Sequence, residues 1–311
     1  MSTAAVLPTS KARAYVEFAR PFTLMPPALG VLSGAITAWG AGHHRDPLTL
    51  ELLLPVVAGT LMAAVLNAFN NALNQIYDLD IDRVNKPKRP LPSGTLSMRE
   101  AWMFTWASCA VAWVLAWLAA PGGRRECFWI VVFTTALCWL YSAPPLWTKR
   151  RGIWANITIA IPRGVLLKVA GWSTVKTIFG PEPWYIGAIF GLFLLGAAST
   201  KDFADIEGDR AGGCTTLPIQ YGVKAAAWLI APFFVLPFFL IPIGVWQGVL
   251  TGNATLLMIL GPALILYGIY TVYLLVRRPE ELATTENHPS WTHMYRMMMV
   301  AQIGFALAYL F

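Results

Sequence analysis

Charged residues are scarce in this chain of 311 residues. Asp, Glu, Lys and Arg make up 13% of it, against about 25% in a typical soluble domain. Apolar residues make up 57%. This balance excludes a disordered chain, a disulfide-stapled secreted module and most cytosolic folds, and it favours an integral membrane protein with lipid as its surroundings.

Cysteines and nucleotide-binding motifs are also scarce. The four cysteines show no CxxC or Cys/His spacing typical of a metal centre. The sequence has no Walker-type GxxxxGK[ST] loop, no GxSxG elbow and no GxGxxG after a strand. The net charge of +7 lies on an apolar chain, so it indicates cytoplasmic loops and anionic lipid headgroups, and not nucleic acid. No obligatory protein partner is evident.

Long hydrophobic runs are abundant. A helix needs about 20 mostly apolar residues to cross roughly 30 Å of hydrocarbon. Nine stretches qualify: 22–41, 54–77, 101–120, 127–145, 153–172, 184–201, 225–246, 255–276 and 294–311. The expected fold is all-α, a single multi-pass transmembrane domain over residues 1–311. It has about nine helices, with eight as the alternative, around a central cavity that opens near the cytoplasmic side.

The distribution of basic residues predicts the orientation of these spans. Most of the 23 lysines and arginines fall in the N-terminal segment 1–20 and in the loops after the second, fourth, sixth and eighth spans. The opposite side holds only Arg45, Arg124, Arg125 and Lys176 outside the spans. Because basic loops stay in the cytoplasm, we expect the N-terminal segment and the even-numbered loops there, in the inner membrane if the protein is bacterial.

Two groups of acidic residues lie on that same side. Asn67, Asn71, Asn74, Asp78 and Asp82 recur at helical spacing through the end of the second span, so they form one stripe. Asp202, Asp205 and Asp209 follow the sixth span at spacings of three and four residues. The segments also resemble each other, because DLDIDR at 78–83 matches DIEGDR at 205–210. This match suggests an internal repeat with two equivalent sites across one cavity.

Carboxylates and amides at this spacing are typical of a magnesium site. Mg²⁺ takes oxygen ligands, commonly one or two carboxylates per ion, and bridges to substrate phosphates. Two such groups beside lysines and arginines fit an organic diphosphate. The alternative is that the acids are solvated loop residues balanced by nearby basic residues. It leaves the asparagines of the apolar run unexplained, since polar groups within a membrane are costly.

Two motifs carry a resemblance to a known family. They are Asn74-x3-Asp78-x3-Asp82 followed by RVNKPKRPLPSG, and Asp202-x2-Asp205-x3-Asp209 in KDFADIEGDR. The pair resembles the UbiA superfamily of intramembrane prenyltransferases, and the resemblance covers nearly the whole chain. Some segments are similar to homogentisate-type enzymes, and others to chlorophyll synthases and digeranylgeranylglyceryl phosphate synthases, so the acceptor stays open.

The resemblance implies a diphosphate site with two Mg²⁺ ions. The implied metal ligands are Asn74, Asp78, Asp82, Asp202, Asp205 and Asp209, of which Asp78, Asp82, Asp205 and Asp209 are the catalytic residues. The diphosphate-binding candidates are Arg83, Lys149 and Arg210, although Lys149 and its basic neighbours also satisfy the topology. The expected acceptor or prenyl pocket includes Asn71, Tyr141 and Arg163. Arg163 has two interpretations, contact with an acceptor carboxylate or phosphate, and pairing or snorkelling within the bundle.

The expected activity is transfer of a polyprenyl group from an allylic diphosphate to a lipophilic acceptor by Mg²⁺-assisted ionisation. The acceptor candidates are homogentisate or hydroxybenzoate, chlorophyllide, and geranylgeranylglyceryl phosphate. One alternative is an intramembrane terpene cyclase, in which a double bond of the substrate attacks the cation. A transporter or lipid carrier is less favoured, because transporters place their ion-binding acids near the membrane midplane.

Overall fold

The computed structural model describes residues 10–43, 47–285 and 288–311, so residues 1–9 of the expected N-terminal segment lie outside the described part. Within these ranges the secondary structure consists of helices and turns, with no strand. The all-α prediction is confirmed for this part of the chain.

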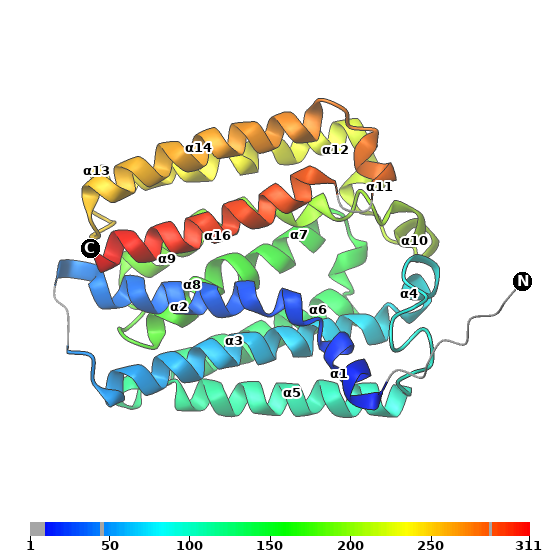
Figure 1. Cartoon of the computed structure of the whole chain (residues 1–311), viewed down its shortest axis with the longest axis horizontal. Coiled ribbons are helices and arrows are strands. Elements are labelled where there is room, and N and C mark those ends of the chain that lie inside the picture. The colour runs from blue at the N-terminus through cyan, green and yellow to red at the C-terminus, as the bar shows by residue number, and fades with distance from the viewer. Residues whose placement is uncertain (1–9, 44–46, 286–287) are drawn as a thin grey trace, which may run out of the picture.

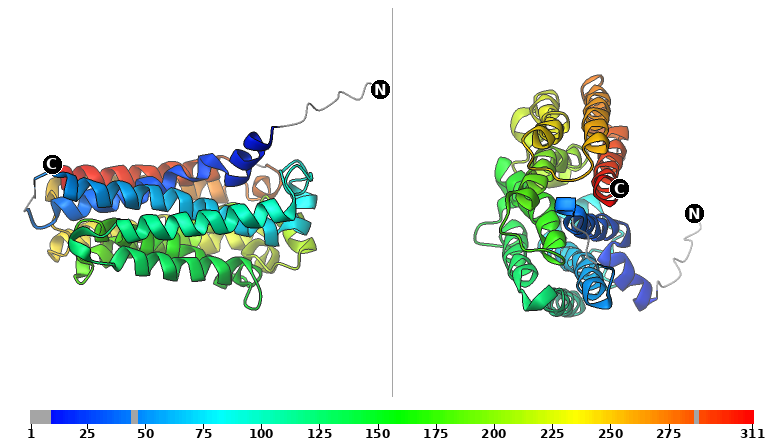
Figure 2. Two further views of the ribbon diagram at one scale, coloured as in Figure 1. Left: turned by 90° about the horizontal axis from the view of Figure 1, so that it is seen from below. Right: turned by 90° about the vertical axis from the view of Figure 1, so that its left-hand side faces the viewer.

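Long helices lie side by side along the longest axis of the molecule (Figure 1). The continuous ones are α2 (Met25–Gly40), α3 (Leu50–Tyr77), α5 (Met98–Leu118), α6 (Glu126–Ser142), α9 (Pro181–Ala197), α14 (Ala254–Val276) and α16 (Pro289–Leu310). In the end-on view, α14 lies on one side of the bundle and α3 and α5 on the other (Figure 2).

Two further rods are interrupted at prolines. The first runs from α7 (Ile153–Ala160) through a π-helical turn, Ile161–Leu166, into α8 (Leu167–Ser173). The second runs from α12 (Val223–Ile230) through two 3₁₀ turns, Ala231–Phe234 and Leu236–Phe239, into α13 (Leu240–Trp246). Proline has no N–H to donate, so the helical hydrogen-bond pattern changes there and neighbouring helices must satisfy the freed carbonyls.

Short helices gather around the ends of these rods. They are α1 (Lys11–Ala19), α4 (Leu79–Asn85), α10 (Ile206–Ala211), α11 (Leu217–Tyr221) and α15 (Glu281–Thr284). Of these, α4, α10 and α11 lie at one end of the bundle, whereas α13 and the C-terminus lie at the other (Figure 1).

Six helices of the described residues are long and apolar enough to cross a membrane. The bent pair Lys11–Thr23 and Met25–Gly40, which meets at 49°, raises this number to seven. Helix α6 is apolar but has only 17 residues, and α16 has 22. The chain is therefore a multi-pass membrane protein, and the expected number of nine crossings stays a prediction.

The helix faces fit these surroundings. Trp106, Trp228 and Ile259 are each more than half exposed, at 51%, 57% and 61%, and lipid accepts such apolar surface as water does not. Inside the bundle, small residues let backbones approach. A methyl group on Gly171 of α8 would lie 2.2 Å from the carbonyl oxygen of Val31 in α2, so glycine is required where these two helices cross.

Candidate active site

The two acidic motifs have the same local backbone. Asp78 lies between α3 and α4 with φ −97° and ψ 11°, and Asp205 precedes α10 with φ −101° and ψ 8°. Helices α4 and α10 then pack against each other, with Gly208 of α10 directly against the side chain of Asn85. The likeness between the two segments in sequence is therefore matched by a likeness in conformation, and the motifs meet at one end of the bundle.

A cavity of about 350 Å³ brings most of the expected site residues together. Its lining includes carboxylates from both motifs and continues into apolar side chains of α3, α6 and α8. The expected residues that line it are Asn71, Asn74, Asp78, Tyr141, Lys149, Arg163, Asp202, Asp205 and Asp209, whereas Asp82, Arg83 and Arg210 do not.

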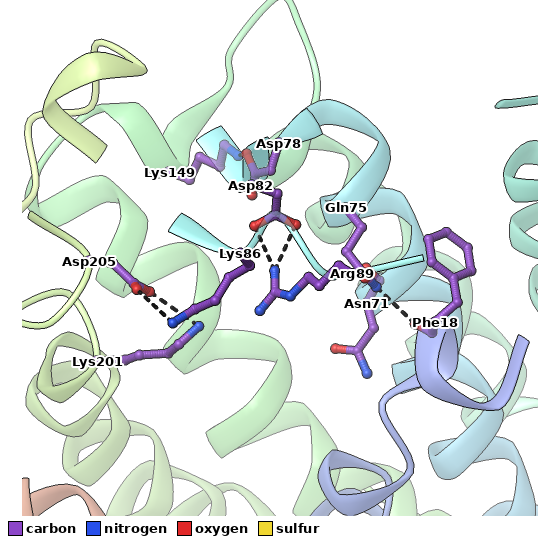
Figure 3. Close-up of polar contacts among 10 residues, drawn as sticks. All are labelled: Phe18, Asn71, Gln75, Asp78, Asp82, Lys86, Arg89, Lys149, Lys201 and Asp205. Atoms are coloured by element: carbon purple, nitrogen blue, oxygen red, sulfur yellow. Dashed lines mark hydrogen bonds and ion pairs between the residues drawn. The ribbon is translucent and has the colours of Figure 1, made fainter. Parts of the chain in front are cut away.

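Basic side chains pair with the carboxylates of the first motif. Lys149, only 6% exposed, contacts the carboxylate of Asp78. Asp82 is 5% exposed, and Nη1 of Arg89 donates to both of its carboxylate oxygens, at 2.6 and 2.7 Å (Figure 3). Asp82 thus fastens the loop after α4 to that helix, beside the cavity and not in its wall.

The second motif is paired in the same way. Nζ of Lys201 lies 3.3 Å and Nζ of Lys86 lies 3.8 Å from the carboxylate oxygens of Asp205. Lys86 follows α4, so this contact joins the two motifs (Figure 3). Lysine ammonium groups therefore contact Asp78 and Asp205, two of the residues that the family resemblance implies as Mg²⁺ ligands.

Asp202 and Asp209 lie close enough for their carboxylates to repel each other. Burial, together with the nearby carboxylate of Asp209, raises the pKa of Asp202 to about 7. Burial and the carboxylate of Asp205 raise the pKa of Asp209 to about 6. Burial also lowers the pKa of Lys149 to about 8. Ionised acids are disfavoured here unless a cation joins them.

This donor set fits Mg²⁺. Among the described residues, no three His, Cys, Asp or Glu side chains are already arranged to hold a metal ion. Mg²⁺ does not require such a cage, because it keeps several waters and commonly binds through one or two carboxylates and substrate phosphates. The carboxylates of Asp78, Asp202, Asp205 and Asp209, with the amide of Asn74, provide these oxygens around one cavity.

Two of the expected diphosphate-binding residues lie outside the cavity. The side chain of Arg83 is 60% exposed and pairs with Asp80 at 2.8 Å, and Arg210 is exposed. Both occupy the solvent side of their short helices. The family resemblance implies a diphosphate-binding role for them by position, because each follows the last aspartate of its motif.

An amide ladder on α3 holds the break before α2. Nδ2 of Asn67 donates to the carbonyl oxygen of Thr23 at 2.9 Å, and Nδ2 of Asn71 donates to that of Ala19 at 3.0 Å. Nε2 of Gln75 donates to the carbonyl oxygen of Phe18 at 2.8 Å (Figure 3). We call Asn67, Asn71 and Gln75 the amide ladder. It explains polar residues in an apolar span, and it shows Asn71 tied to the backbone as well as lining the cavity.

Four basic residues at the site escaped the sequence analysis. Lys86, Arg89 and Lys201 pair with the motif carboxylates, and Arg20 lines the cavity. The run KPKR that contains Lys86 and Arg89 was visible, but spacing could not tell which of its side chains turn inward. Pro21, directly after Arg20, was the available signal that a helix ends there.

Comparison with known proteins agrees with this geometry. Residues 24–288 match the model of the UbiA prenyltransferase family. The chain belongs to this family. It is similar to several UbiA relatives with different acceptors in their names, which confirms the mixed pattern of its motifs.

Three relatives illustrate the range. The chain is 28% identical over 229 residues to chlorophyll synthase of Arabidopsis thaliana, which covers 71% of this chain and 57% of that protein. It is 33% identical over 226 residues to homogentisate solanesyltransferase of the same plant, and this match covers 68% of this chain and 55% of that protein. It is 34% identical over 238 residues to digeranylgeranylglyceryl phosphate synthase of Methanopyrus kandleri, and this match covers 76% of this chain and 80% of that protein. The chain thus spans little more than half the length of the plant relatives.

A solved UbiA structure has the same fold. A homolog from Archaeoglobus fulgidus, bound to GPP and Mg²⁺, superposes with a TM-score of 0.71 at 22% identity, covering 96% of this chain and 99% of that one. The likeness extends over nearly all of both chains, so the whole arrangement of helices is that of the UbiA fold.

Proposed function

We propose that this UbiA-family protein transfers a polyprenyl group from an allylic diphosphate to a lipophilic acceptor. The observation that carries the proposal is the meeting of both acidic motifs at one cavity, with a lysine against Asp78 and two lysines near Asp205. A diphosphate needs both cations and basic side chains, whereas its prenyl tail needs apolar walls, and this cavity offers all three.

In this proposal the acidic residues bind metal ions and the basic residues bind the diphosphate. Asn74, Asp78, Asp202, Asp205 and Asp209 would hold two Mg²⁺ ions, which would supply positive charge to stabilise the departing diphosphate. Asp82 lies outside the cavity and positions the loop after α4 through its ion pair with Arg89. Its expected place among the metal ligands stays a prediction.

Basic side chains hold the diphosphate. Lys149, Lys86 and Lys201 pair with carboxylates at the site, and they become available to phosphate oxygens when those carboxylates bind metal. Charge-assisted hydrogen bonds of this kind orient the diphosphate. The roles expected of Arg83 and Arg210 would require these exposed side chains to turn toward the cavity mouth.

The apolar part of the cavity takes the reacting carbon and the tail. When the carbon–oxygen bond breaks, the electron pair leaves with the diphosphate and an allylic cation remains. The ring of Tyr141 lines this region and offers a π face to the cation. An electron-rich carbon or oxygen of the acceptor attacks and then loses a proton. The active end of the bundle is cytoplasmic in this proposal, and the membrane is the inner one if the protein is bacterial.

A transfer assay tests the function. Purified protein in nanodiscs receives Mg²⁺, geranylgeranyl diphosphate and one acceptor at a time: homogentisate, hydroxybenzoate, chlorophyllide or geranylgeranylglyceryl phosphate. We expect a prenylated product by mass spectrometry, lost on chelation of Mg²⁺. Asp78→Asn and Asp205→Asn should each lower kcat at least about 100-fold, as loss of one electrostatic stabiliser does in other enzymes.

Glu281→Gln is the matched control, because Glu281 is a partly exposed carboxylate that pairs with Arg278 and does not line the cavity. It should retain wild-type turnover. Wild-type rates in both aspartate variants would overturn the assignment of the site. A prenyl product formed without any acceptor would indicate a cyclase, and movement of the lipid without a covalent product would indicate a carrier.

A further inference from the structure

A second hollow lies on the outer surface of the bundle, apart from the active-site cavity. It is a groove of about 760 Å³ between α7, α9, α11 and α12. Its lining consists of apolar and aromatic side chains, among them Ile153, Leu195, Leu217 and Trp228. Ile153 and Trp228 are 44% and 57% exposed, so the groove faces the lipid. We call it the side groove.

The side groove has about the length of one membrane leaflet. It begins at Tyr221, at the end of the bundle where α10 and α11 lie, and follows α12 to Phe233 (Figure 1). At about 1.5 Å per helical residue this stretch is about 18 Å long. Half of a hydrocarbon core of roughly 30 Å is about 15 Å. One acyl chain of the leaflet on that side therefore matches the groove, whereas a membrane-crossing helix of another protein would extend beyond it.

The end of the groove near Tyr221 carries a positive charge without a counter-charge. Lys224 is exposed in the first turn of α12, four residues before Trp228, so the two side chains share a face. Helices α7, α11 and α12 contain no acidic residue, and Lys224 has no ion pair with any described carboxylate. Tyrosine and tryptophan are enriched at the headgroup level of membranes. An apolar groove with a cation at headgroup level fits an anionic phospholipid.

One layer of residues separates the side groove from the active-site cavity. Leu195 lines the groove, and the preceding Leu194 lines the cavity. Leu217 and the preceding Thr216 are divided in the same way. A molecule in the groove therefore packs against the back of the cavity wall.

This wall is bonded to the second motif. Asn156, which lines the cavity, donates from Nδ2 to the carbonyl oxygen of Leu195 and to Oγ of Ser199, both at 2.7 Å. The carbonyl oxygen of Ser199 in turn accepts from the backbone N–H of Asp202 at 3.1 Å. A chain packed against Leu195 therefore supports the turn that positions Asp202 and the neighbouring Lys201.

We propose that the side groove binds a phospholipid of the leaflet next to the acidic motifs, with one acyl chain along the groove and its anionic headgroup at Lys224. An empty groove would lose dispersion contacts along its whole length, and the chain fills it. The bound lipid stabilises the turn before the second motif and so supports catalysis. That last effect rests on the proposed function, whereas the binding of the lipid does not.

Native mass spectrometry measures the binding. The full chain is stripped of lipid in mild detergent and titrated with phosphatidylglycerol, or with phosphatidylcholine that has the same acyl chains. We expect one phosphatidylglycerol to stay bound, with a Kd about fivefold lower than that of phosphatidylcholine, the factor of one lysine beside an anionic headgroup. Equal affinities for the two lipids would overturn the assignment of the headgroup.

Two variants locate the lipid. Lys224→Gln should raise the Kd of phosphatidylglycerol about fivefold and remove the preference for it. Lys88→Gln is the matched control, because Lys88 is an exposed lysine that follows α4 at the same end of the bundle. Ala225→Trp places an indole in the groove and should weaken the binding of both lipids at least about tenfold, the scale of a poorly fitted apolar group.

Binding by Ala225→Trp equal to that of the wild type would overturn the proposal. A wild-type dimer that Ala225→Trp abolishes would also overturn it, because the groove would then hold a second copy of the chain. If Ala225→Trp does not fold, Lys224→Gln decides the test, since it changes only an exposed side chain.

Transfer kinetics test the effect on catalysis separately. We expect kcat of the wild type to be about fivefold higher in nanodiscs of phosphatidylglycerol than in those of phosphatidylcholine, since displacements below 1 Å at a reacting site cost less than about 100-fold. The difference should vanish in Lys224→Gln and persist in Lys88→Gln. Lipid binding without this difference would overturn the effect on catalysis. Absence of product in every nanodisc would contradict the proposed function, and the binding titration would still decide the lipid site.

Discussion

Three consecutive basic residues after α6 have three different surroundings. Lys149 is 6% exposed and contacts Asp78. The guanidinium of Arg150 lies 3.5 Å from the centroid of the Trp147 ring, and Arg151 is exposed, with a long 3.4 Å hydrogen bond to the carbonyl oxygen of Pro145. The orientation of the helices in the membrane depends only on the charge of these three residues. The proposed diphosphate site depends in addition on the position of the Lys149 side chain.

Substitution of Lys149 by glutamine tests that distinction. The change leaves Asp78 without its ammonium partner and removes one cation from the proposed diphosphate site. We expect kcat/KM for the prenyl diphosphate to fall about 100-fold. Arg151→Gln, two residues away, should stay within about twofold of the wild type. Equal losses in the two variants would mean that the loop contributes only its charge.

Residues of the site differ in how far the sequence could predict them. The meeting of Asp78, Asp202, Asp205 and Asp209 at one cavity could be predicted, because few acids lie beside apolar spans and helical spacing places those of each motif on one face of their helix. Arg20 was missed, because its role depends on a break in the helix and on contacts from Asn71 and Gln75. Such contacts join residues about 50 positions apart, and periodicity carries no information about them.

At the scale of elements, α4 and α10 form the junction between the two motifs. A methyl group on Gly208 would lie 2.2–2.3 Å from the side-chain atoms of Asn85. Real Cβ atoms do not approach so closely, so a larger residue at position 208 must move Asn85 or separate the two helices.

Gly208→Ala should therefore misplace one motif relative to the other. We expect transfer activity to fall about 10- to 100-fold, since shifts of about 1 Å in a reacting site have such effects. The double variant Gly208→Ala/Asn85→Ala relieves the clash and should recover activity. Gly180→Ala is the matched control, because a Cβ at position 180 meets nothing within 4 Å. An inactive double variant would contradict the steric explanation.

The amide ladder is the second element-scale feature with a measurable role. Asn71→Ala removes the donor to the carbonyl oxygen of Ala19 and to Oγ1 of Thr23. Hydrogen bonds between membrane helices contribute about 0.6 kcal/mol on average and up to about 1.7. Two lost bonds should lower the melting temperature by several degrees. Asn70→Ala is the control, since the hydrogen bonds described from α3 side chains to residues 18–23 come from Asn67, Asn71 and Gln75. An equal shift in both variants would argue against a specific tether.

At the scale of the whole molecule, the helices were predictable and their breaks were not. Apolar runs fixed the positions of the long helices, since a membrane imposes a minimum length. The π-helical turn at Pro162 and the 49° bend before α2 depend on packing and on the amide ladder, which no hydropathy pattern contains.

Orientation is a whole-molecule property that cysteine labelling can measure. The four native cysteines are buried, so an added exposed cysteine reports its own side of the membrane. Gln247→Cys follows α13 and Glu280→Cys follows α14, at opposite ends of the bundle. We expect a membrane-impermeant maleimide to label only Gln247→Cys in intact cells, and both after permeabilisation. The reverse pattern would place the acidic motifs outside the cell.

The lysine–aspartate pairs make the site electrically self-balanced. A metal ion that binds an aspartate leaves the lysine ammonium group without its ion-pair partner. A diphosphate that binds the ammonium group leaves the aspartate without its partner. When both ligands are bound, every charged group has a partner. Each ligand should therefore tighten the binding of the other by the same factor. Titration of Mg²⁺ with and without an unreactive prenyl diphosphate analogue measures this factor, and a value of one would contradict it. A site of this kind responds to the coincidence of metal and substrate, and not to the concentration of either one.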